Sequence, residues 1–177
     1  YDDCDLFISR SGYTGEDGFE ISISNNKAEK LIIDILNNNN VMLCGLGCRD
    51  SLRVEAGLSL YGNEINENIN PVQAGLSWAL DKNRLQDHNL NGSEILSQEL
   101  SSIPSVKKIG LSPINKIMLR NQMTIHNNNK EEIGFITSGC YSPILKKSIG
   151  IGYIDKLSNI SEKKYINVRD KYEEIKL

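Results

Sequence analysis

The chain has 177 residues, of which 39% are hydrophobic and 24% are charged, a normal composition for a globular protein with a sizeable core. Its net charge of −3 and its isoelectric point near 5.5 argue against nucleic acid or an anionic membrane surface as the main partner. The longest mainly apolar stretch, 31–36, is far too short to span a bilayer, and no N-terminal segment has the pattern of a signal peptide.

The beginning of the chain predicts a β-hairpin. An apolar run at 6–8 and an alternating run at 19–24 flank a Gly- and Asp-rich segment, 12–18, whose glycines we expect to adopt positive φ. The same segment could be taken for a phosphate-binding loop, but Glu16 and Asp17 would repel the anion. The hairpin is therefore the better interpretation.

Two helices and a short strand are predicted next. Asn26 and Glu29 resemble a capping pair at the start of a helix that runs to Leu36. Residues 41–46 have the pattern of a short buried strand, and residues 47–56 that of a helix closed by Gly57.

The middle of the chain, 59–104, has a loose pattern with one predicted helix near 93–100, and we interpret it as a connector packed on both neighbours. From residue 106 onward, short apolar or alternating runs broken by Gly, Asn and Pro predict a small barrel or sandwich. The runs are 108–111, 123–125, 133–136, 149–154 and 165–168. The residues alone thus predict an α+β region followed by a small β domain.

The four cysteines give no sign of a metal site. Cys4, Cys44, Cys48 and Cys140 contain no Cys-x-x-Cys, and the one close pair, Cys44 and Cys48, has no histidine nearby. We expect buried or half-buried thiols in a reducing compartment, and no metal.

A hydrolase site is poorly supported. Both histidines, His88 and His126, stand in polar, Asn-rich surroundings, and no Gly-x-Ser-x-Gly motif is present. Ser138 has no base near it in sequence, and we expect it in a turn between strands.

Glu20 is the most informative polar residue, because it alternates with the apolar Phe19 and Ile21 on the second predicted strand. Its face of the strand could simply be solvated. Alternatively, its carboxylate could accept two parallel N–H donors, such as the ring nitrogen and amino group of a pterin.

Arg49 and Trp78 are also open to two interpretations. Arg49 lies in the first turn of a predicted helix, where a cation is mildly unfavourable, so it could bind a carboxylate or carbonyl or form an ion pair with an acidic neighbour. Trp78, the only tryptophan, could be a core or interface anchor or one wall of a cavity for a flat ring.

Several motifs resemble, in order and in spacing, those of the glycine-cleavage T-protein family of aminomethyltransferases. They are SGYTGEDGFEI at 11–21, GLGCRDSLRVEAGL at 45–58, LYGNE at 60–64, PVQAGLSW at 71–78, IGFITSGCYSP at 133–143 and IGY at 151–153. Together they cover nearly the whole chain.

The resemblance implies a fold of three domains around a central folate site. Residues 1–82 would form the C-terminal part of the folate-binding domain, 83–105 a connector, and 106–177 an antiparallel C-terminal β-barrel. In the family, the Glu at the position of Glu20 binds the pterin and the Arg at Arg49 contacts the folate. The positions of Tyr13 and Trp78 resemble cavity-lining positions.

The implied reaction transfers the methylene of an aminomethyl group, carried on the lipoyl arm of H-protein, to tetrahydrofolate with release of ammonia. The family's catalytic Asp has no match here, so the catalytic residues are unknown and the chain alone is expected to be inactive. Tetrahydrofolate is a substrate, lipoylated H-protein the partner, and the compartment bacterial cytoplasm or mitochondrial matrix.

Three alternatives remain. The fold also serves as the folate module of sarcosine and dimethylglycine oxidoreductases, and the chain could be a non-catalytic fragment that binds folate or a partner. A folate-binding paralogue that assists iron–sulfur assembly is disfavoured, because its Lys-Gly-Cys-Tyr-x-Gly-Gln motif is absent.

Overall fold

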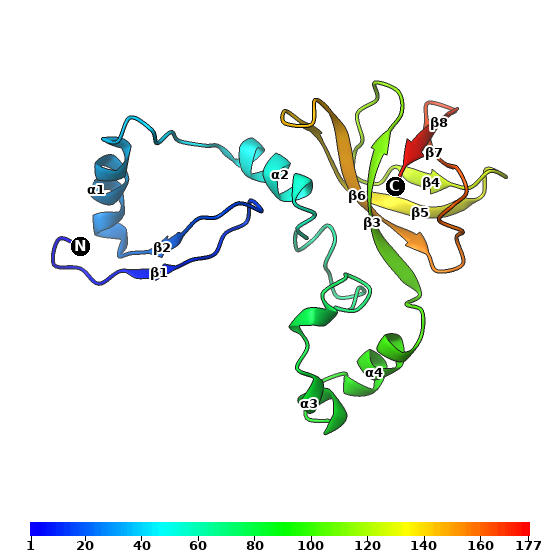
Figure 1. Ribbon diagram of the computed structural model, residues 1–177, viewed down its shortest axis with the longest axis horizontal. Helices are drawn as coiled ribbons and strands as arrows, with labels where there is room; N and C mark the ends of the chain where they lie inside the picture. The colour runs from blue at the N-terminus through cyan, green and yellow to red at the C-terminus, as the bar shows by residue number, and fades with distance from the viewer. The chain divides into compact units, whose positions relative to one another are not determined.

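The computed structural model describes residues 1–177, which pack as two compact units (Figure 1). We call Tyr1–Leu58 the hairpin unit and Ser59–Leu177 the barrel unit. None of the helices combines the length and apolarity needed to cross a bilayer.

The hairpin unit contains two strands and two helices. Strands β1 (Phe7–Ser9) and β2 (Glu20–Ser22) pair antiparallel, with Ser9 opposite Glu20. Helices α1 (Asn25–Leu36) and α2 (Leu46–Glu55) follow. The predicted hairpin and both helices are therefore confirmed, although each strand is only 3 residues long.

The loop between β1 and β2 is held at its base by an ion pair. Arg10 donates through Nε and Nη2 to the two carboxylate oxygens of Asp17, both at 2.8 Å. Only one loop glycine, Gly15, has a positive φ, of 78°, so the expectation for Gly12 and Gly18 is wrong. A Cβ at Gly15 would lie 2.5 Å from the Cβ of Ala56, so this position needs glycine because the loop approaches the end of α2 closely.

The strand predicted at 41–46 does not form, because the only sheet of this unit is the two-stranded β1–β2 pair and these residues have no strand to pair with. Met42 and Leu43 are instead 82% and 76% exposed. The expected capping pair is also wrong: the N-cap of α1 is Ser24, which makes no side-chain capping bond.

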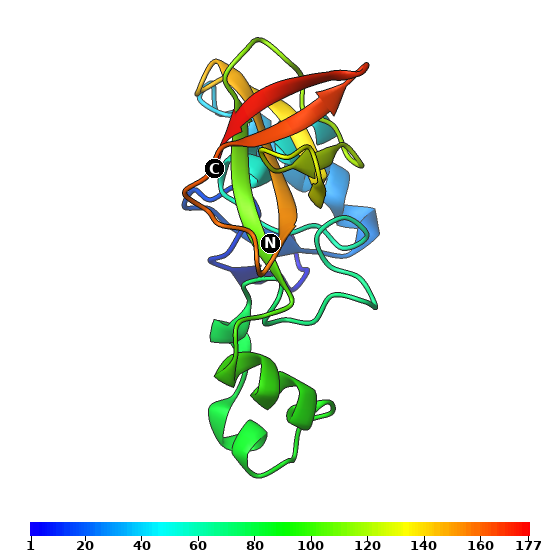
Figure 2. The same ribbon diagram turned by 90° about the vertical axis from the view of Figure 1, so that its right-hand side faces the viewer.

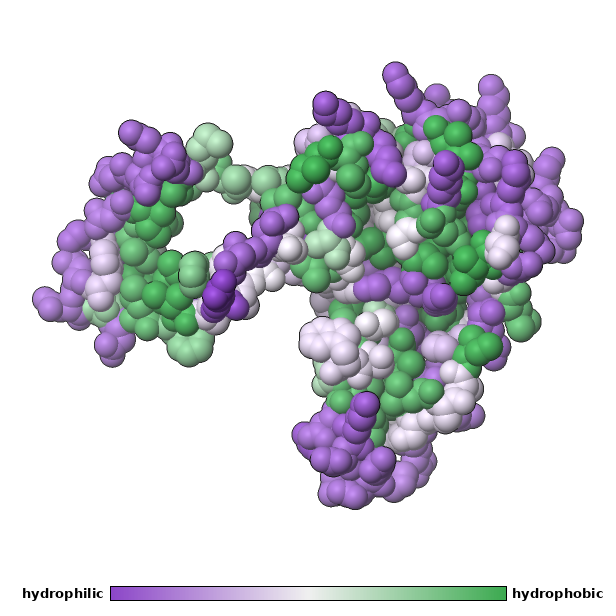
Figure 3. Space-filling model, in the orientation of Figure 1, coloured by the Kyte–Doolittle hydropathy of each residue, from purple (hydrophilic) through white to green (hydrophobic).

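The hairpin unit buries very little. Arg53 and Val54 are its only buried residues, whereas Phe7, Phe19 and Ile33 are 73%, 66% and 53% exposed. Figure 3 shows green, hydrophobic residues at the surface of the hairpin unit on the face in view.

The barrel unit begins with turns and irregular structure, 59–76, followed by the 3-10 helix η1 (Ser77–Ala79), α3 (Lys82–Gln86) and α4 (Ser93–Ser101). Helix α4 confirms the one helix predicted here. Helix α3 was missed, although Asp81 is a standard N-cap whose side chain accepts from the amides of Asn83 and Arg84 at 2.9 and 3.2 Å.

Six antiparallel strands then close into a barrel in the order β3-β6-β5-β4-β7-β8, which confirms the barrel rather than the sandwich (Figures 1 and 2). The strands are β3 (Val106–Pro113), β4 (Thr124–His126), β5 (Glu132–Ser142), β6 (Lys147–Asp155), β7 (Lys164–Val168) and β8 (Lys171–Lys176). The α+β fold class with a small antiparallel barrel is therefore confirmed.

Aliphatic side chains fill the barrel, namely Leu111, Leu119, Ile125, Ile133, Ile136, Ile154, Ile166 and Ile175. The strands approach so closely that a Cβ at Gly134 would lie 2.0 Å from the carbonyl oxygen of Tyr153. Ser138 is not in a turn, as expected, but within β5 and only 3% exposed.

Candidate functional site

Glu20 stands at the first position of β2 and is exposed, as the solvated-face interpretation expects. Its Oε2 accepts a short hydrogen bond from the hydroxyl of Ser11. The hydroxyl of Ser11 lies in turn 2.7 Å from that of Ser9. The carboxylate is therefore exposed but held by a side chain of the hairpin loop.

Arg49, the fourth residue of α2, stacks on the same loop. Its guanidinium carbon lies 4.4 Å from the centre of the Tyr13 ring, which is cation–π geometry. Stacking on an aromatic face leaves the edge N–H groups of a guanidinium able to donate to a carboxylate or carbonyl.

The ion pair considered for Arg49 is made by its neighbour one turn on. Arg53 donates to Asp50 at 2.9 Å and to the carbonyl of Leu58 at 3.3 Å, and is only 1% exposed. Arg53 therefore has a structural role at the end of α2, and Arg49 is the arginine that can reach a ligand.

Trp78 lies on η1 in the barrel unit and is 81% exposed. It is therefore not a core anchor of that unit. The structure brings Tyr13 and Arg49 into contact and places Glu20 on the hairpin that carries Tyr13, whereas Trp78 belongs to the other unit.

The expectation of buried thiols is wrong for two cysteines. Cys44 and Cys48 are exposed, Cys4 and Cys140 are half-buried, and all four are free. A hydrogen bond with Cys44 raises the pKa of the Cys48 thiol above its usual value, which opposes formation of the reactive thiolate. The structure contains no group of three or more His, Cys, Asp or Glu placed to hold a metal ion.

A buried carboxylate in the barrel unit was not singled out from the sequence. Glu64 is fully buried and accepts through Oε2 from the amide of Leu60 at 2.9 Å and through Oε1 from the Thr137 hydroxyl. The Tyr153 hydroxyl donates to the Glu64 carbonyl at 2.9 Å. These bonds fasten the LYGNE segment, 60–64, to β5 and β6.

The surroundings of Glu64 shift two pKa values. Burial raises the pKa of Tyr153 to about 12, and the charge of Glu64 adds to this rise. Burial lowers the pKa of Lys108, which donates to the hydroxyl of Ser59 at 2.9 Å. The LYGNE motif was the signal for this network, but spacing alone did not reveal that its Glu is buried.

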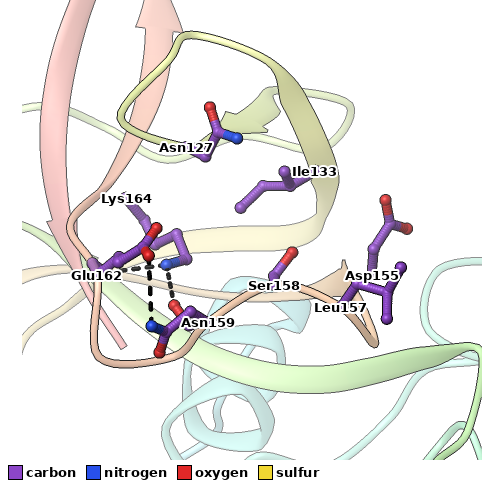
Figure 4. Close-up of a pocket in the computed structure, with 8 residues that line it drawn as sticks. All are labelled: Asn127, Ile133, Asp155, Leu157, Ser158, Asn159, Glu162 and Lys164. Atoms are coloured by element: carbon purple, nitrogen blue, oxygen red, sulfur yellow. Dashed lines mark hydrogen bonds between the residues drawn. The ribbon is translucent and has the colours of Figure 1, made fainter.

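A cavity of about 250 Å³ lies beside the loop between β6 and β7 (Figure 4). The ammonium of Lys164, which is 1% exposed, donates there to the carbonyls of Asn159 and Glu162. Carboxylates of Asp155 and Glu162 also line this cavity and would repel an anion. Lys164 therefore fastens the loop and does not form an anion site.

Two family models match the chain. Residues 1–84 match the GCVT N-terminal domain, and residues 107–177 match the glycine cleavage T-protein C-terminal barrel domain. The chain belongs to the glycine cleavage T-protein family. The first model covers all four candidate site residues, Tyr13, Glu20, Arg49 and Trp78.

Named relatives agree with this assignment. The T-protein chain is 45% identical to the mitochondrial aminomethyltransferase of Flaveria trinervia over 84% of its own length and 37% of the relative's. It is 40% identical to that of Pisum sativum over 95% of its length and 42% of the relative's.

A solved structure, the glycine cleavage system aminomethyltransferase T from Bartonella henselae, matches with a TM-score of 0.90 and 35% identity. This match covers 97% of the T-protein chain and 48% of the Bartonella chain. The chain therefore spans less than half the length of these relatives. The domain boundaries that the family resemblance implies, at residues 82 and 105, stay predictions. The division into compact units after Leu58 reflects contacts within this chain and does not test them.

Proposed function

We propose that this T-protein chain is part of a tetrahydrofolate-dependent aminomethyltransferase. The enzyme transfers the methylene of a lipoyl-bound aminomethyl group on H-protein to tetrahydrofolate and releases ammonia. The observation that carries the proposal is the stacking of Arg49 on Tyr13 beside the hairpin that presents Glu20, all within a segment matched by the family.

Each site residue has a defined task in this proposal. The Glu20 carboxylate accepts from the ring N–H and amino group of the pterin, since an ionised carboxylate can take two parallel donors. Arg49 donates to a carbonyl or carboxylate of the folate, and Tyr13 holds its guanidinium plane. Trp78, exposed in the barrel unit, supplies an aromatic wall.

The catalytic carboxylate belongs to the part of the family fold that this chain does not match. We expect the chain alone to be inactive, lipoylated H-protein to be the partner, and tetrahydrofolate to be a substrate with no metal required. Relatives named as mitochondrial and a bacterial solved structure support a mitochondrial matrix or bacterial cytoplasmic location.

Calorimetry with tetrahydrofolate tests this function. It compares the 177-residue chain with a chimera in which the unmatched N-terminal part of the Pisum sativum relative precedes it. We expect the chimera to bind and to release ammonia from aminomethylated H-protein. A folded chimera that binds no folate would instead favour a non-catalytic role.

Glu20→Gln should weaken folate binding by about 1–3 kcal/mol, because one charge-assisted acceptor is lost. Glu16→Gln is the matched control, since Glu16 is an exposed carboxylate of the neighbouring loop with no role in the site. The folate affinity of the Glu16→Gln variant should equal that of the wild type. Equal affinities for wild type and Glu20→Gln would refute the pterin assignment.

A further inference from the structure

An exposed glutamate would normally sample several rotamers, and binding a ligand would cost the entropy of fixing one. Glu20 is exposed, yet its Oε2 is bonded to the Ser11 hydroxyl. The orientation of the carboxylate is therefore set before any ligand arrives.

Carboxylate chemistry fixes the direction of the hydrogen bonds. An ionised carboxylate only accepts, so Ser11 must donate its single hydroxyl hydrogen to Glu20. The 2.7 Å contact between Ser9 and Ser11 then requires Ser9 to be the donor. The result is a directed chain from Ser9 to Ser11 to Glu20.

The backbone holds this chain in place at both ends. Ser9 is the direct cross-strand partner of Glu20 in the β1–β2 pair. Ser11 follows at the start of the loop, next to Arg10, whose two bonds to Asp17 fasten the base of that loop. The hydroxyl of Ser11 is thus positioned by a strand on one side and an ion pair on the other.

We propose that Ser11 is a positioning residue for Glu20 in the tetrahydrofolate site, and that Ser9 acts through Ser11. This inference rests on the proposed function. A carboxylate has about four acceptor positions, and Ser11 occupies one of them on Oε2. Those that remain can accept the two donors of a pterin, so the serines contribute by preorganisation and touch no ligand.

Folate calorimetry on the chain and the chimera tests the proposal through a mutant cycle. Ser11→Ala should weaken binding about three- to ten-fold, because the Glu20 carboxylate loses the hydrogen bond that orients it. Ser9→Ala should weaken it less, because only the bond that orients Ser11 is lost. Ser11→Thr keeps the hydroxyl and should restore affinity to within about two-fold. Ser22→Ala, an exposed serine of β2, is the matched control and should have no effect.

Non-additivity separates positioning from a general loss of structure. If Ser9 acts through Ser11, adding Ser9→Ala to Ser11→Ala should weaken binding no further. Additive effects of the two changes, or failure of Ser11→Thr to rescue, would overturn the proposal. Absence of folate binding by the folded chimera with the wild-type sequence would instead refute the proposed function.

A measurement without folate tests the Ser11–Glu20 contact whether or not folate binds. Three-bond NMR couplings of Glu20 in the 177-residue chain should report one fixed χ1 rotamer in the wild type and in Ser11→Thr. In Ser11→Ala the couplings should be averaged over several rotamers. Averaged couplings in the wild type would overturn the proposal whatever the outcome of the folate titrations.

Discussion

The two units differ in how far they bury their apolar side chains. The barrel unit encloses eight aliphatic core residues within a ring of six strands. The hairpin unit buries only Arg53 and Val54, and leaves aromatic and aliphatic side chains of its strands and helices in contact with water. The barrel unit therefore has a hydrophobic core of its own, whereas the hairpin unit keeps its apolar side chains at the surface.

This difference teaches how stability and ligand binding are divided in the chain. A segment of about 60 residues already has a marginal core when it folds well, so the hairpin unit gains little stability from its own contacts. Its site is built from a hydrogen-bonded loop and a cation–π pair, which fix individual side chains at low energetic cost. The six barrel strands carry none of the proposed folate-binding residues, since Trp78 of the barrel unit lies on η1.

The largest expected effect is a core truncation in the barrel. Ile136→Ala removes a fully buried side chain and should lower the free energy of unfolding by about 2–5 kcal/mol. Ile33→Ala on α1, where the side chain is 53% exposed, should change it by less than about 0.5 kcal/mol. Urea unfolding followed by circular dichroism measures both. A comparable loss for Ile33→Ala would contradict the comparison, because it would show that α1 buries this side chain.

The buried carboxylate should come next. Glu64→Ala deprives the Leu60 amide of its acceptor and leaves Thr137 with the Ile151 carbonyl alone, so we expect a loss of about 1–3 kcal/mol. Glu67→Ala changes an exposed carboxylate of the same segment and should be nearly neutral. Chemical unfolding of both variants provides the measurement, and equal stabilities would exclude an anchoring role for Glu64.

Alkaline pH should weaken the barrel through Tyr153. Its pKa is raised from 10.0 to about 12, so the unfolded chain releases this proton before the folded one. The stability that folding gains from protonated Tyr153 is complete below pH 10 and is lost as the pH rises toward about 12. Thermal unfolding between these values should show a decline that is smaller in Tyr153→Phe. An identical decline in the variant would mean that other groups cause it.

The smallest effect concerns the loop tip of the hairpin unit. Gly15→Ala requires a positive φ and places a Cβ against Ala56, so we expect about 1–2 kcal/mol of local destabilisation. Adding Ala56→Gly removes the close contact but not the backbone cost, and should restore part of the loss. Hydrogen exchange of the α2 amides measures the difference. No recovery in the double variant would show that the contact with Ala56 does not matter.

Sequence reasoning succeeded where periodicity and turn chemistry agree. Alternating apolar residues and the glycines between them predicted the hairpin and five barrel strands. These predictions hold because each of these strands finds its hydrogen-bonding partner strand within the chain. It failed at residues 41–46, where an apolar run has no strand to pair with in its unit. It also missed β8, since KYEEIK carries charges at most positions and has no apolar run.

The candidate site was only partly predictable. Motif resemblance pointed to Glu20, Arg49, Tyr13 and Trp78, but spacing could not decide whether Arg49 binds a ligand or forms an ion pair with an acidic neighbour. The structure assigns that ion pair to Arg53 and leaves Arg49 on Tyr13. The bond from Ser11 to Glu20 joins residues on opposite sides of a loop, and a periodic pattern carries no information on such a contact.

The closed ring of the barrel also governs how the chain can associate with itself. Every barrel strand has a neighbour on both sides, so none offers a row of unpaired amides and carbonyls to another molecule. The β1–β2 ribbon has two free edges, flanked by exposed Phe7 and Phe19. At high concentration, intermolecular strand addition should therefore begin at this ribbon, and a proline on the outer edge of β1 should suppress it while the barrel stays unaffected.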